Sequence, residues 1–298
     1  MNKIMLTVYT PTYNRGYCLG RLYESLLRQK KSNFEWLIID DGSTDNTKEL
    51  VSQWISDKKI NIRYFYQINA GKAQALNVAH DMINTELCTC VDSDDYLVDN
   101  AIESIITKWE EVRSNRKIAG IVGLDRYEDG SIVGTMFPMN LSTAKYAEFE
   151  TKYNIKGDKK FVYRTDVIRE FPKYPLIAKE KFPAIGYLYR LIDQKYDLCL
   201  VNTVLCVVEY LEDGISKNKI TQFKKCPNSF AFYRLERMRL AIDFKDRFKN
   251  AIHYVSSCLF AKKNIFKNNP YSLTTFLALP LGYLLNLYIR RTNRKGVV

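Results

Sequence analysis

The sequence predicts an α/β fold in which a mostly parallel sheet carries helices on both faces. The main observation is that strand and helix patterns alternate over residues 1–125. The second is that a polar loop follows each expected strand. Strands that alternate with helices of this length are typical of right-handed βαβ units, and a parallel sheet needs both of its faces covered. With 298 residues, the chain can bury the core of one large domain or of a domain and a half.

The elements follow from short apolar runs and from apolar residues at helical spacing. The expected strands are Ile4–Tyr9, Phe34–Ile39, Ile62–Tyr66, Leu87–Val91 and Ile118–Val122. The helices between them are marked by Leu19 to Leu27, Leu50 to Ile55, Ala75 to Met82 and, last, about Asn100 to Val112. The first loop is expected to begin at Thr10, directly after the first strand.

The loops after the first four strands carry the side chains with the most chemistry. Tyr13, Asp41 and Lys72 follow the first three strands, and Asp92-Ser93-Asp94-Asp95 follows the fourth. The carboxyl ends of parallel strands meet at one edge of a sheet, where ligands bind. Clustered carboxylates repel one another unless a cation shares the site, and aspartate oxygens suit Mg²⁺ or Mn²⁺. This edge is therefore expected to bind a nucleoside diphosphate with a divalent cation, although an acidic turn that caps the next helix gives the same pattern.

In four motifs the chain resembles the GT-A glycosyltransferases of family 2. The motifs are Pro11-Thr12-Tyr13-Asn14-Arg15, Ile38-Ile39-Asp40-Asp41-Gly42-Ser43-Thr44-Asp45, Asn69-Ala70-Gly71-Lys72-Ala73-Gln74-Ala75-Leu76-Asn77 and Val91-Asp92-Ser93-Asp94-Asp95. The resemblance implies a Rossmann-like GT-A fold. Its nucleotide-sugar-binding half would be residues 1–125, and the acceptor-binding half of the same catalytic domain would be 126–214. Residues 215–298 would then form a helical, basic extension.

The resemblance also implies roles for individual side chains at the donor site. Pro11 and Tyr13 would lie against the base and the ribose, and Asp41 would accept a hydrogen bond from the imide N–H of uracil. Lys72 would lie near the nucleotide. In the DxD element Asp92-Ser93-Asp94, Asp94 would bind Mn²⁺ or Mg²⁺ directly, and Asp92, the second residue of the metal site, would lie nearer the ribose.

The activity implied by the resemblance is an inverting, metal-dependent transfer of a hexosyl or hexosaminyl group. The donor would be a nucleotide sugar, with UDP favoured, and the acceptor a glycan or a lipid-linked saccharide in cell-surface polysaccharide synthesis. A divalent cation would stabilise the departing diphosphate, and the acceptor hydroxyl would need a general base. The sequence does not reveal the sugar, the linkage or the oligomeric state.

The general base is the weakest part of this assignment. In the family it is an acidic residue of the acceptor half, and Glu180 is the candidate in the segment 175–183. Flanking lysines are expected to lower its basicity. Asp193, on an expected amphipathic helix where a surface charge is equally plausible, and Glu209 are the other candidates. A non-catalytic nucleotide-sugar-binding module therefore stays open, as does a sugar nucleotidyltransferase, although no Gly-rich basic loop follows the first strand.

The cysteines are expected to have packing roles, and the two histidines surface or packing roles. Cys88 and Cys90 alternate with apolar residues along a strand, and His80 and His253 lie on expected helices without partners. The seven cysteines show no CxxC pairing, and the apolar start is too short for a signal peptide. These features predict a reducing, cytoplasmic location.

The positive charge of the chain is concentrated in its last part. Residues 215–298 hold 17 Lys and Arg against 3 Asp and Glu, so the rest is close to neutral and nucleic-acid binding is not expected. One long helix is predicted from about Ser229 to Leu259. Tyr271–Ile289 then has no charged residue and approaches the ~20 residues of a spanning helix, but it contains Pro280 and Gly282. Spanning would also place the basic cluster with Arg294 and Lys295 outside. We expect this segment to lie on an anionic membrane surface, at the inner face of the plasma membrane, or to fold onto the domain.

Overall fold

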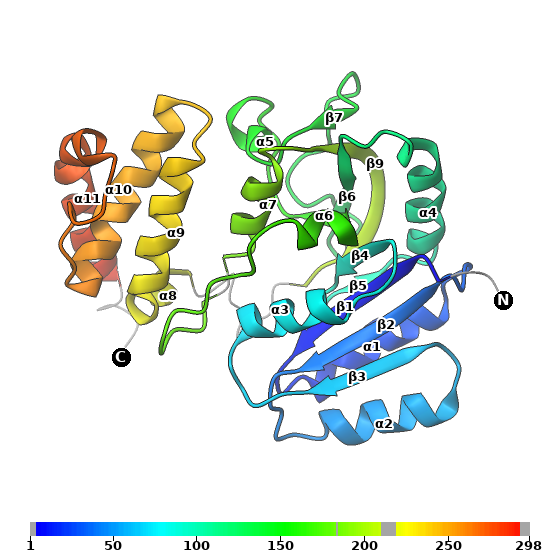
Figure 1. Ribbon diagram of the computed structural model, residues 1–298. Coiled ribbons are helices and arrows are strands. Elements are labelled where there is room, and N and C mark those ends of the chain that lie inside the picture. Colours follow the sequence, from blue (N-terminus) through cyan, green and yellow to red (C-terminus); the bar gives the residue numbers. More distant parts are fainter. Residues whose placement is uncertain (1–3, 183, 210–218, 293–298) are drawn as a thin grey trace. The chain divides into compact units, whose positions relative to one another are not determined.

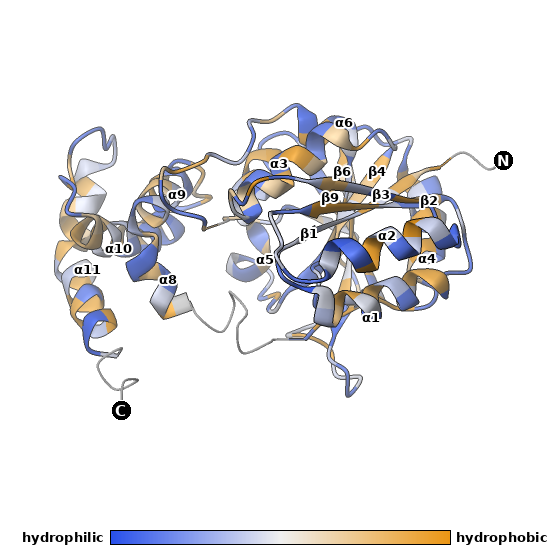
Figure 2. Cartoon of the chain, turned by 90° about the horizontal axis from the view of Figure 1, so that it is seen from below, coloured by the Kyte–Doolittle hydropathy of each residue, from blue (hydrophilic) through white to orange (hydrophobic). Residues whose placement is uncertain are grey.

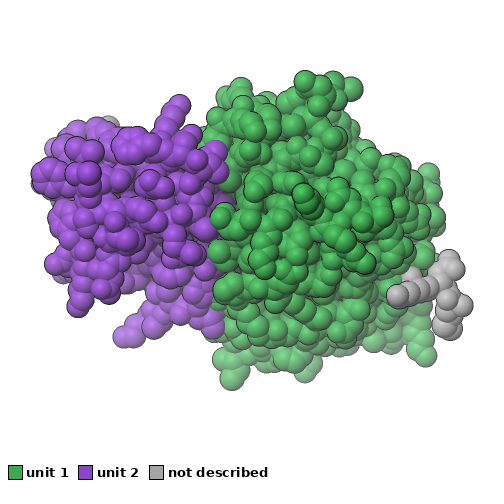
Figure 3. Space-filling view, turned by 45° about the horizontal axis from the view of Figure 1, so that its top comes forward, with its two compact units in different colours: residues 1–174, 191–209 green, residues 175–190, 210–298 purple. Residues whose placement is uncertain are grey.

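The computed structural model of the chain describes residues 4–182, 184–209 and 219–292 (Figure 1). The chain forms two compact units (Figure 3). Residues 1–174 and 191–209 form one, which we call the sheet unit, and residues 175–190 and 210–298 form the other, which we call the helical unit. The predicted division differs, because residues 175–190 were expected in the acceptor half. The boundary at residue 214 and the basic residues Arg294 and Lys295 lie outside the described residues.

The sheet unit is built on one mixed sheet. Its first four strands are parallel neighbours in the order β3 (Ile62–Tyr66), β2 (Phe34–Asp40), β1 (Leu6–Thr12) and β4 (Leu87–Cys90). The sheet then continues through β8 (Lys159–Arg164), β6 (Ile118–Arg126) and β9 (Asp197–Val207), with β8 antiparallel to both of its neighbours. Two short strands pair antiparallel with β9, namely β5 (Tyr96–Leu97) and β7 (Thr143–Ala144).

Helices cover both faces of this sheet, as predicted (Figure 2). On one face lie α1 (Gly16–Leu27), α2 (Thr47–Asp57) and α4 (Ala101–Val112), and on the other α3 (Lys72–Met82) and α6 (Thr165–Arg169). Shorter helices are α5 (Glu148–Thr151) and α7 (Gly186–Ile192). Stacked aromatic rings fix α1 and α2 on β2: Tyr23 lies 4.3 Å from Trp54, and Trp36 lies 5.8 Å from Trp54 between ring centroids.

Strand β1 is longer than predicted and includes Pro11, which was expected in a loop. The reason lies in its pairing. Val91 N donates to Tyr9 O on the β4 side, and Asp41 N donates to Thr12 O on the β2 side. Because N–H groups alternate between the two sides, the missing N–H of Pro11 faces β4, whose pairing with β1 has ended at Cys90. The proline therefore costs the ladder no hydrogen bond.

The helical unit contains α8 (Lys219–Lys225), α9 (Pro227–Arg239), α10 (Phe244–Ala261) and α11 (Ser272–Thr292). The prediction of a single helix from Ser229 to Leu259 is wrong, because the helix is interrupted between the end of α9 at Arg239 and the start of α10 at Phe244. Asp243 caps α10 by accepting a hydrogen bond from Asp246 N at 2.7 Å. The apolar spacing continues across the break, so the periodicity gave no sign of it.

Helices α10 and α11 run in the same direction. Asn286 Nδ2 donates to Ser256 O at 3.0 Å, and the Arg290 guanidinium lies 4.8 Å from the Phe260 ring, so later residues of α11 meet later residues of α10. The connection 262–271 returns along α10, and Tyr271 reaches the Arg247 guanidinium at 5.1 Å. This arrangement fixes which side of α11 faces its neighbour.

Candidate functional site

The loops after β1 and β2 are joined by hydrogen bonds at the carboxyl edge of the sheet. Asn14 N donates to Ser43 Oγ at 2.9 Å, and Asn14 Oδ1 accepts from Thr44 N at 2.7 Å. Asp45 accepts from Gly16 N at 3.0 Å. Burial would raise the pKa of Asp45, but its hydrogen bonds, among them those from Thr47 and Gly16, lower it. Two of the four sequence motifs are thus held together as one surface.

Asp41 anchors the loop that follows β3. Its Oδ1 accepts from Gln67 Nε2 at 2.7 Å and from Ala70 N at 2.8 Å, and its Oδ2 accepts from Gly71 N at 2.8 Å. Gly71 has a φ of +94°, which favours glycine, and it directly precedes α3. Asp41 is only 5% exposed and therefore positions the start of α3, including Lys72. Its predicted contact with uracil stays a prediction.

Lys72 and Asp92 form an ion pair between α3 and the loop after β4. Lys72 Nζ lies 2.7 Å from both carboxylate oxygens of Asp92, and the Asp92 side chain is 39% exposed. Loss of hydration would raise the pKa of Asp92, but the charge and hydrogen bonds of Lys72 outweigh this effect, and the pKa is lowered. The pKa of Lys72 is raised, because the Asp92 carboxylate outweighs the effect of its burial. Hydrogen bonds thus connect all four motifs along one edge.

The next carboxylates of the cluster are less well compensated. Burial raises the pKa of Asp94, and the Asp92 carboxylate raises it further. Burial also raises the pKa of Asp95, to about 8, against the opposing effect of Lys160. Negative charge on Asp94 and Asp95 is therefore unfavourable without a further cation.

Two buried residues behind this cluster escaped the sequence analysis. Lys160 of β8 donates to Cys90 O at 3.3 Å, and its charge lowers the pKa of both Asp95 and Asp125. Asp125 lies on β6, and its burial raises its pKa to about 6. The one signal in the sequence is a lysine pair at the start of the apolar run Phe161-Val162-Tyr163. Because β8 was not among the predicted strands, this lysine pair could not be assigned to the site from the sequence.

The donor groups at this edge fit a cation that arrives with a diphosphate. Among residues 4–182, 184–209 and 219–292, no group of three or more His, Cys, Asp or Glu is arranged to hold a metal. Asp92 and Asp94 would thus supply at most two carboxylates, and Asp92 is already paired with Lys72. Mg²⁺ and Mn²⁺ commonly bind to one or two carboxylates and complete their shell with phosphate and water oxygens. The assignment of Asp94 and Asp92 as ligands stays a prediction.

The other predicted donor-site residues differ in their exposure. Tyr13 is 48% exposed at the end of β1, whereas Pro11 is buried within the strand. Ser93 is also buried, and its carbonyl accepts from Cys18 Sγ at 3.4 Å. Of these three side chains, Tyr13 is the one available to stack on a ligand at this edge.

Glu180 belongs to the helical unit, where its carboxylate binds the first turn of α9. It accepts from Asn228 N at 3.0 Å, Asn228 Nδ2 at 2.7 Å and Ser229 N at 2.6 Å. Burial would raise the pKa of Glu180, but these hydrogen bonds lower it. The direction agrees with the sequence prediction, whereas the cause is the N-terminus of α9 and not the flanking lysines. A lowered pKa weakens a general base.

The two other candidates for the base lie in the sheet unit. Asp193 is buried, not a surface charge, and accepts from Tyr146 N at 2.9 Å and Ala147 N at 2.8 Å, so it has a structural role. Glu209 lies beside the acidic cluster: its N donates to Asp95 Oδ1 at 3.3 Å, and its carboxylate lies 2.5 Å from Arg21. Geometry within the sheet unit therefore favours Glu209 over Asp193.

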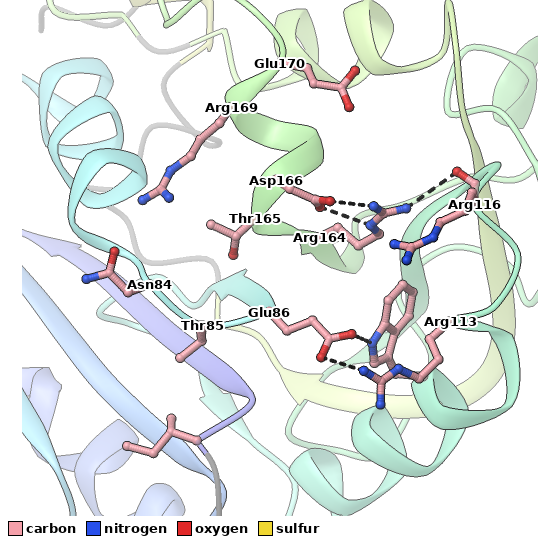
Figure 4. A pocket seen from close by; sticks show the side chains of 12 residues that line it. Asn84, Thr85, Glu86, Arg113, Arg116, Arg164, Thr165, Asp166, Arg169 and Glu170 are labelled. Carbon is pink, nitrogen blue, oxygen red and sulfur yellow. Dashed lines mark hydrogen bonds and ion pairs between the residues drawn. The ribbon is translucent and has the colours of Figure 1, made fainter.

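A cavity of about 700 Å³ lies at the opposite, amino-terminal edge of the sheet (Figure 4). Arginines and acidic side chains line it together, and several of them bind one another. Arg164 Nε lies 3.0 Å from Asp166, and Arg113 lies 3.1 Å from Glu86. Two of the four arginines that line the cavity are thus paired with acidic side chains of the same lining, and none of the four sequence motifs reaches it.

Residues 7–170, more than half of the chain, match the family model described as glycosyl transferase family 2. The chain belongs to this family. The resemblance seen in the four motifs is thus confirmed, and the match covers the first strands, the linked loops and the acidic cluster.

Curated relatives of this family 2 member come from bacteria. The chain is 29% identical to the glycosyltransferase GlyG of Streptococcus pneumoniae over 61% of its length and 60% of that protein. It is 34% identical to a teichoic acid poly(glycerol phosphate) polymerase of Staphylococcus epidermidis over 37% of its length and 15% of that protein. The chain therefore spans less than two thirds of these relatives.

Solved structures share the fold of this family 2 chain. One is S. aureus TarS 1–349 in complex with UDP-GlcNAc, with a TM-score of 0.63 and 18% identity, over 92% of this chain and 79% of that one. Another is the mannosyltransferase PcManGT from Pyrobaculum calidifontis with GDP-Man and Mn²⁺, with a TM-score of 0.55 and 15% identity, over 97% and 88%. The predicted GT-A fold is confirmed by this likeness.

Proposed function

We propose that the chain transfers a sugar from a nucleotide donor, with UDP favoured, to a glycan or lipid-linked acceptor in cell-surface polysaccharide synthesis. The observation that carries this proposal is that hydrogen bonds link the four motif loops at the carboxyl edge. The last of these loops carries Asp94 and the partly exposed Asp92. Family membership and the polysaccharide-related relative support the same reading. A cytoplasmic location at the inner face of the plasma membrane belongs to this proposal.

Within this proposal, the residues at the carboxyl edge have separate roles in binding the donor. Tyr13 stacks on the base, and Asp41 holds the loop that brings Lys72 to the diphosphate. Lys72 exchanges its partner Asp92 for phosphate oxygens as the donor binds. A divalent cation on Asp94 and Asp92 would stabilise the negative charge of the leaving diphosphate. The solved neighbours with UDP-GlcNAc, and with GDP-Man and Mn²⁺, support a nucleotide-sugar donor and a cation.

The test of the donor site is binding of UDP and GDP to the purified chain, with and without Mn²⁺. Wild-type protein is expected to bind UDP in a metal-dependent way, and Asp94→Asn to lose about tenfold or more of that affinity. Asp99→Asn is the matched control, because Asp99 is exposed and pairs with Arg28. Binding of neither nucleotide would refute the donor assignment. Release of pyrophosphate from a nucleoside triphosphate and a sugar phosphate would favour a nucleotidyltransferase instead.

The general base is tested with two matched variants. Glu180→Gln tests the general base assigned from the sequence, and Glu209→Gln tests the residue beside the acidic cluster. The variant that removes the base is expected to lower turnover by about 10²–10⁴-fold and to leave nucleotide-sugar affinity unchanged. If Glu180→Gln keeps its turnover, Glu180 has only its role at α9.

The carboxylate of Glu180 already accepts hydrogen bonds from three donors, and this favours the alternative of a non-catalytic nucleotide-sugar-binding module. Full binding without transfer in the wild type would establish that alternative.

A further inference from the structure

Four of the five buried positions of helix α11 are small or polar, whereas seven of its large apolar side chains are exposed. The buried positions are Thr275, Ala278, Gly282, Asn286 and Ile289. The rest of its surface, which we call the apolar side, carries seven large apolar residues between 45% and 75% exposed: Leu273, Phe276, Leu277, Leu281, Tyr283, Leu284 and Tyr288. A surface helix of a globular protein has the reverse pattern. Small and polar residues between helices, with apolar residues pointing away from them, are typical of packing beside lipid.

The inner side of α11 is committed to α10. A Cβ added at Gly282 would lie 2.5 Å from Val255 Cβ, so the two backbones approach closely there. Asn286 Nδ2 donates to Ser256 O at 3.0 Å, and Asn286 Oδ1 accepts from Arg290 Nε at 2.7 Å. The polar groups of this side thus have partners within the helical unit, and α11 cannot rotate to bury its apolar side without breaking these contacts.

Length and composition alone would allow α11 to cross a membrane. It has 21 residues, with a mean hydropathy of 1.4 and 28% of residues buried in its most apolar window. Its neighbour decides against crossing. The part of α10 that runs beside the first half of α11 carries Lys245, Asp246 and Lys249. A crossing α11 would draw these charges into the hydrocarbon, which is costly.

The charge of the helical unit identifies what covers the apolar side. From residue 215 onward the chain holds 17 basic and 3 acidic residues, and exposed Arg290 and Arg291 follow the apolar side directly. A second copy of the same basic unit on this side would bring like charges together. Anionic lipid headgroups have the complementary charge, and the acyl region below them accepts the apolar side chains.

We propose that the helical unit docks on a membrane surface containing anionic lipid, with α11 lying in the plane of the interface. Its apolar side enters the acyl boundary, and α10 stays on the aqueous side. This inference rests on the membrane location in the proposed function and names the surface that would produce it. It concerns the helical unit alone, so its failure would leave the donor site and sugar transfer in the sheet unit unaffected.

The first test is flotation of the full chain with vesicles of phosphatidylcholine, alone or mixed with phosphatidylglycerol. The wild type is expected to float with the mixed vesicles, less with the neutral ones, and less again at high salt. Phe276→Gln/Leu284→Gln should weaken binding by about tenfold or more. Met136→Gln/Met139→Gln, at exposed positions of the sheet unit, is the matched control and should float like the wild type.

Three results would overturn docking on lipid. One is a wild type that stays unbound at all compositions, and the second is a Phe276→Gln/Leu284→Gln variant that floats unchanged. The third is a dimer, seen by sedimentation equilibrium without lipid, that this variant dissociates while vesicles bind neither protein. That result would assign the apolar side to a second copy. Circular dichroism checks that the variant keeps its helices, which is expected because both side chains point outward.

The second test separates lying in the plane from crossing. Tryptophan is placed in turn at Leu273, Leu281 and Tyr288, along the apolar side, and its quenching by lipids brominated at different depths is measured. The native residues Trp36, Trp54 and Trp109 are buried in the sheet unit and give a constant background. Equal, shallow depths at all three positions support docking in the plane. A deep middle position between shallow ends would overturn it in favour of crossing.

Discussion

At the carboxyl edge, the Lys72 ammonium binds the carboxylate that is a predicted ligand of the divalent cation. This ammonium lies 2.7 Å from both oxygens of Asp92. The positive charge of this ammonium opposes a divalent cation at the same carboxylate, so in the absence of nucleotide the lysine and the cation compete for Asp92. The sequence predicted that both residues meet at this edge, because each follows a parallel strand. It gave no indication that they bind each other.

Replacement of this lysine should therefore strengthen binding of the free cation. We expect Lys72→Met to bind Mn²⁺ without nucleotide about tenfold more tightly than the wild type. Titration of Mn²⁺ by electron paramagnetic resonance measures this. Lys108→Met removes a lysine that pairs with Glu111 on α4 and should leave the affinity unchanged. Weaker Mn²⁺ binding in Lys72→Met would contradict the competition.

His80 makes the sheet unit sensitive to acid. Burial lowers its pKa from 6.5 to about 4, and its Nε2 lies 3.1 Å from Tyr9 Oη. Between pH 6.5 and about 4 the unfolded chain binds a proton that the folded chain does not, so stability rises with pH. Acidification through this window should cost about 1.4 kcal/mol per pH unit from His80 alone.

The measurement is the free energy of unfolding in urea at several pH values for the wild type and His80→Gln. The variant removes the titrating ring, so its slope against pH should be shallower than that of the wild type in this window. Parallel slopes would mean that His80 is protonated to the same extent in both states. Of the surface and packing roles expected for this residue, the structure shows packing, since the ring is buried and also contacts Tyr174. The expectation that it has no partner is wrong, because Tyr9 hydrogen-bonds to it.

Among the elements, the pair α10 and α11 depends on one small side chain. A Cβ at Gly282 would lie 2.5 Å from Val255 Cβ and 2.9 Å from Ile252 O. We expect Gly282→Ala to destabilise the chain by about 1–3 kcal/mol through overpacking. Thermal unfolding followed by circular dichroism measures the effect.

Gly20 provides the control within another helix. A Cβ at Gly20 of α1 meets nothing within 4 Å, so Gly20→Ala should stabilise by about 0.4–1 kcal/mol. Opposite signs for the two substitutions would support the close approach of α10 and α11. Equal stabilisation by both would show that the helices can separate without cost.

The elements also show where sequence patterns suffice. Strands β1, β2 and β4 were predictable, because parallel strands buried on both faces are continuous apolar runs that end in polar loops. Strand β3 lies at the edge of the sheet and is only partly buried, but it is also a short run of large apolar and aromatic residues. Strand β8 begins with the buried pair Lys159 and Lys160, which hides it from such a pattern. At the candidate site, the four motifs located the edge, but Asp125 and the role of Glu180 at α9 depend on distant elements and had no local signal. The lysine pair that includes Lys160 is visible in the sequence, but it could not be placed at this edge without β8.

On the scale of the whole molecule, the helical unit is assembled from two separate segments. Arg190 of the first lies 2.7 Å from Asp246 of the second, and both side chains are buried. Removal of one partner leaves a buried charge, which costs about 3–5 kcal/mol. We expect Arg190→Met to unfold the helical unit at lower temperature and to leave the sheet unit unchanged.

Two spectroscopic signals separate these events. The three tryptophans all lie in the sheet unit, so their fluorescence follows that unit, while circular dichroism follows all helices. In Arg190→Met, the transition seen by circular dichroism should acquire an early phase that fluorescence does not show. Arg239→Met, which removes an exposed partner of Glu236, should change neither signal. A common shift of both signals would mean that the units unfold together.

The parallel course of α10 and α11 has an electrostatic consequence. Each helix carries a macrodipole with its negative pole at the carboxyl end, and here the two negative poles lie side by side, as the contact of Arg290 with Phe260 shows. An antiparallel pair would cancel these poles, whereas a parallel pair must neutralise them. Lys262, Lys263, Arg290 and Arg291 stand at that end of the pair. Part of the positive charge of the C-terminal region is therefore required by two helices that point the same way.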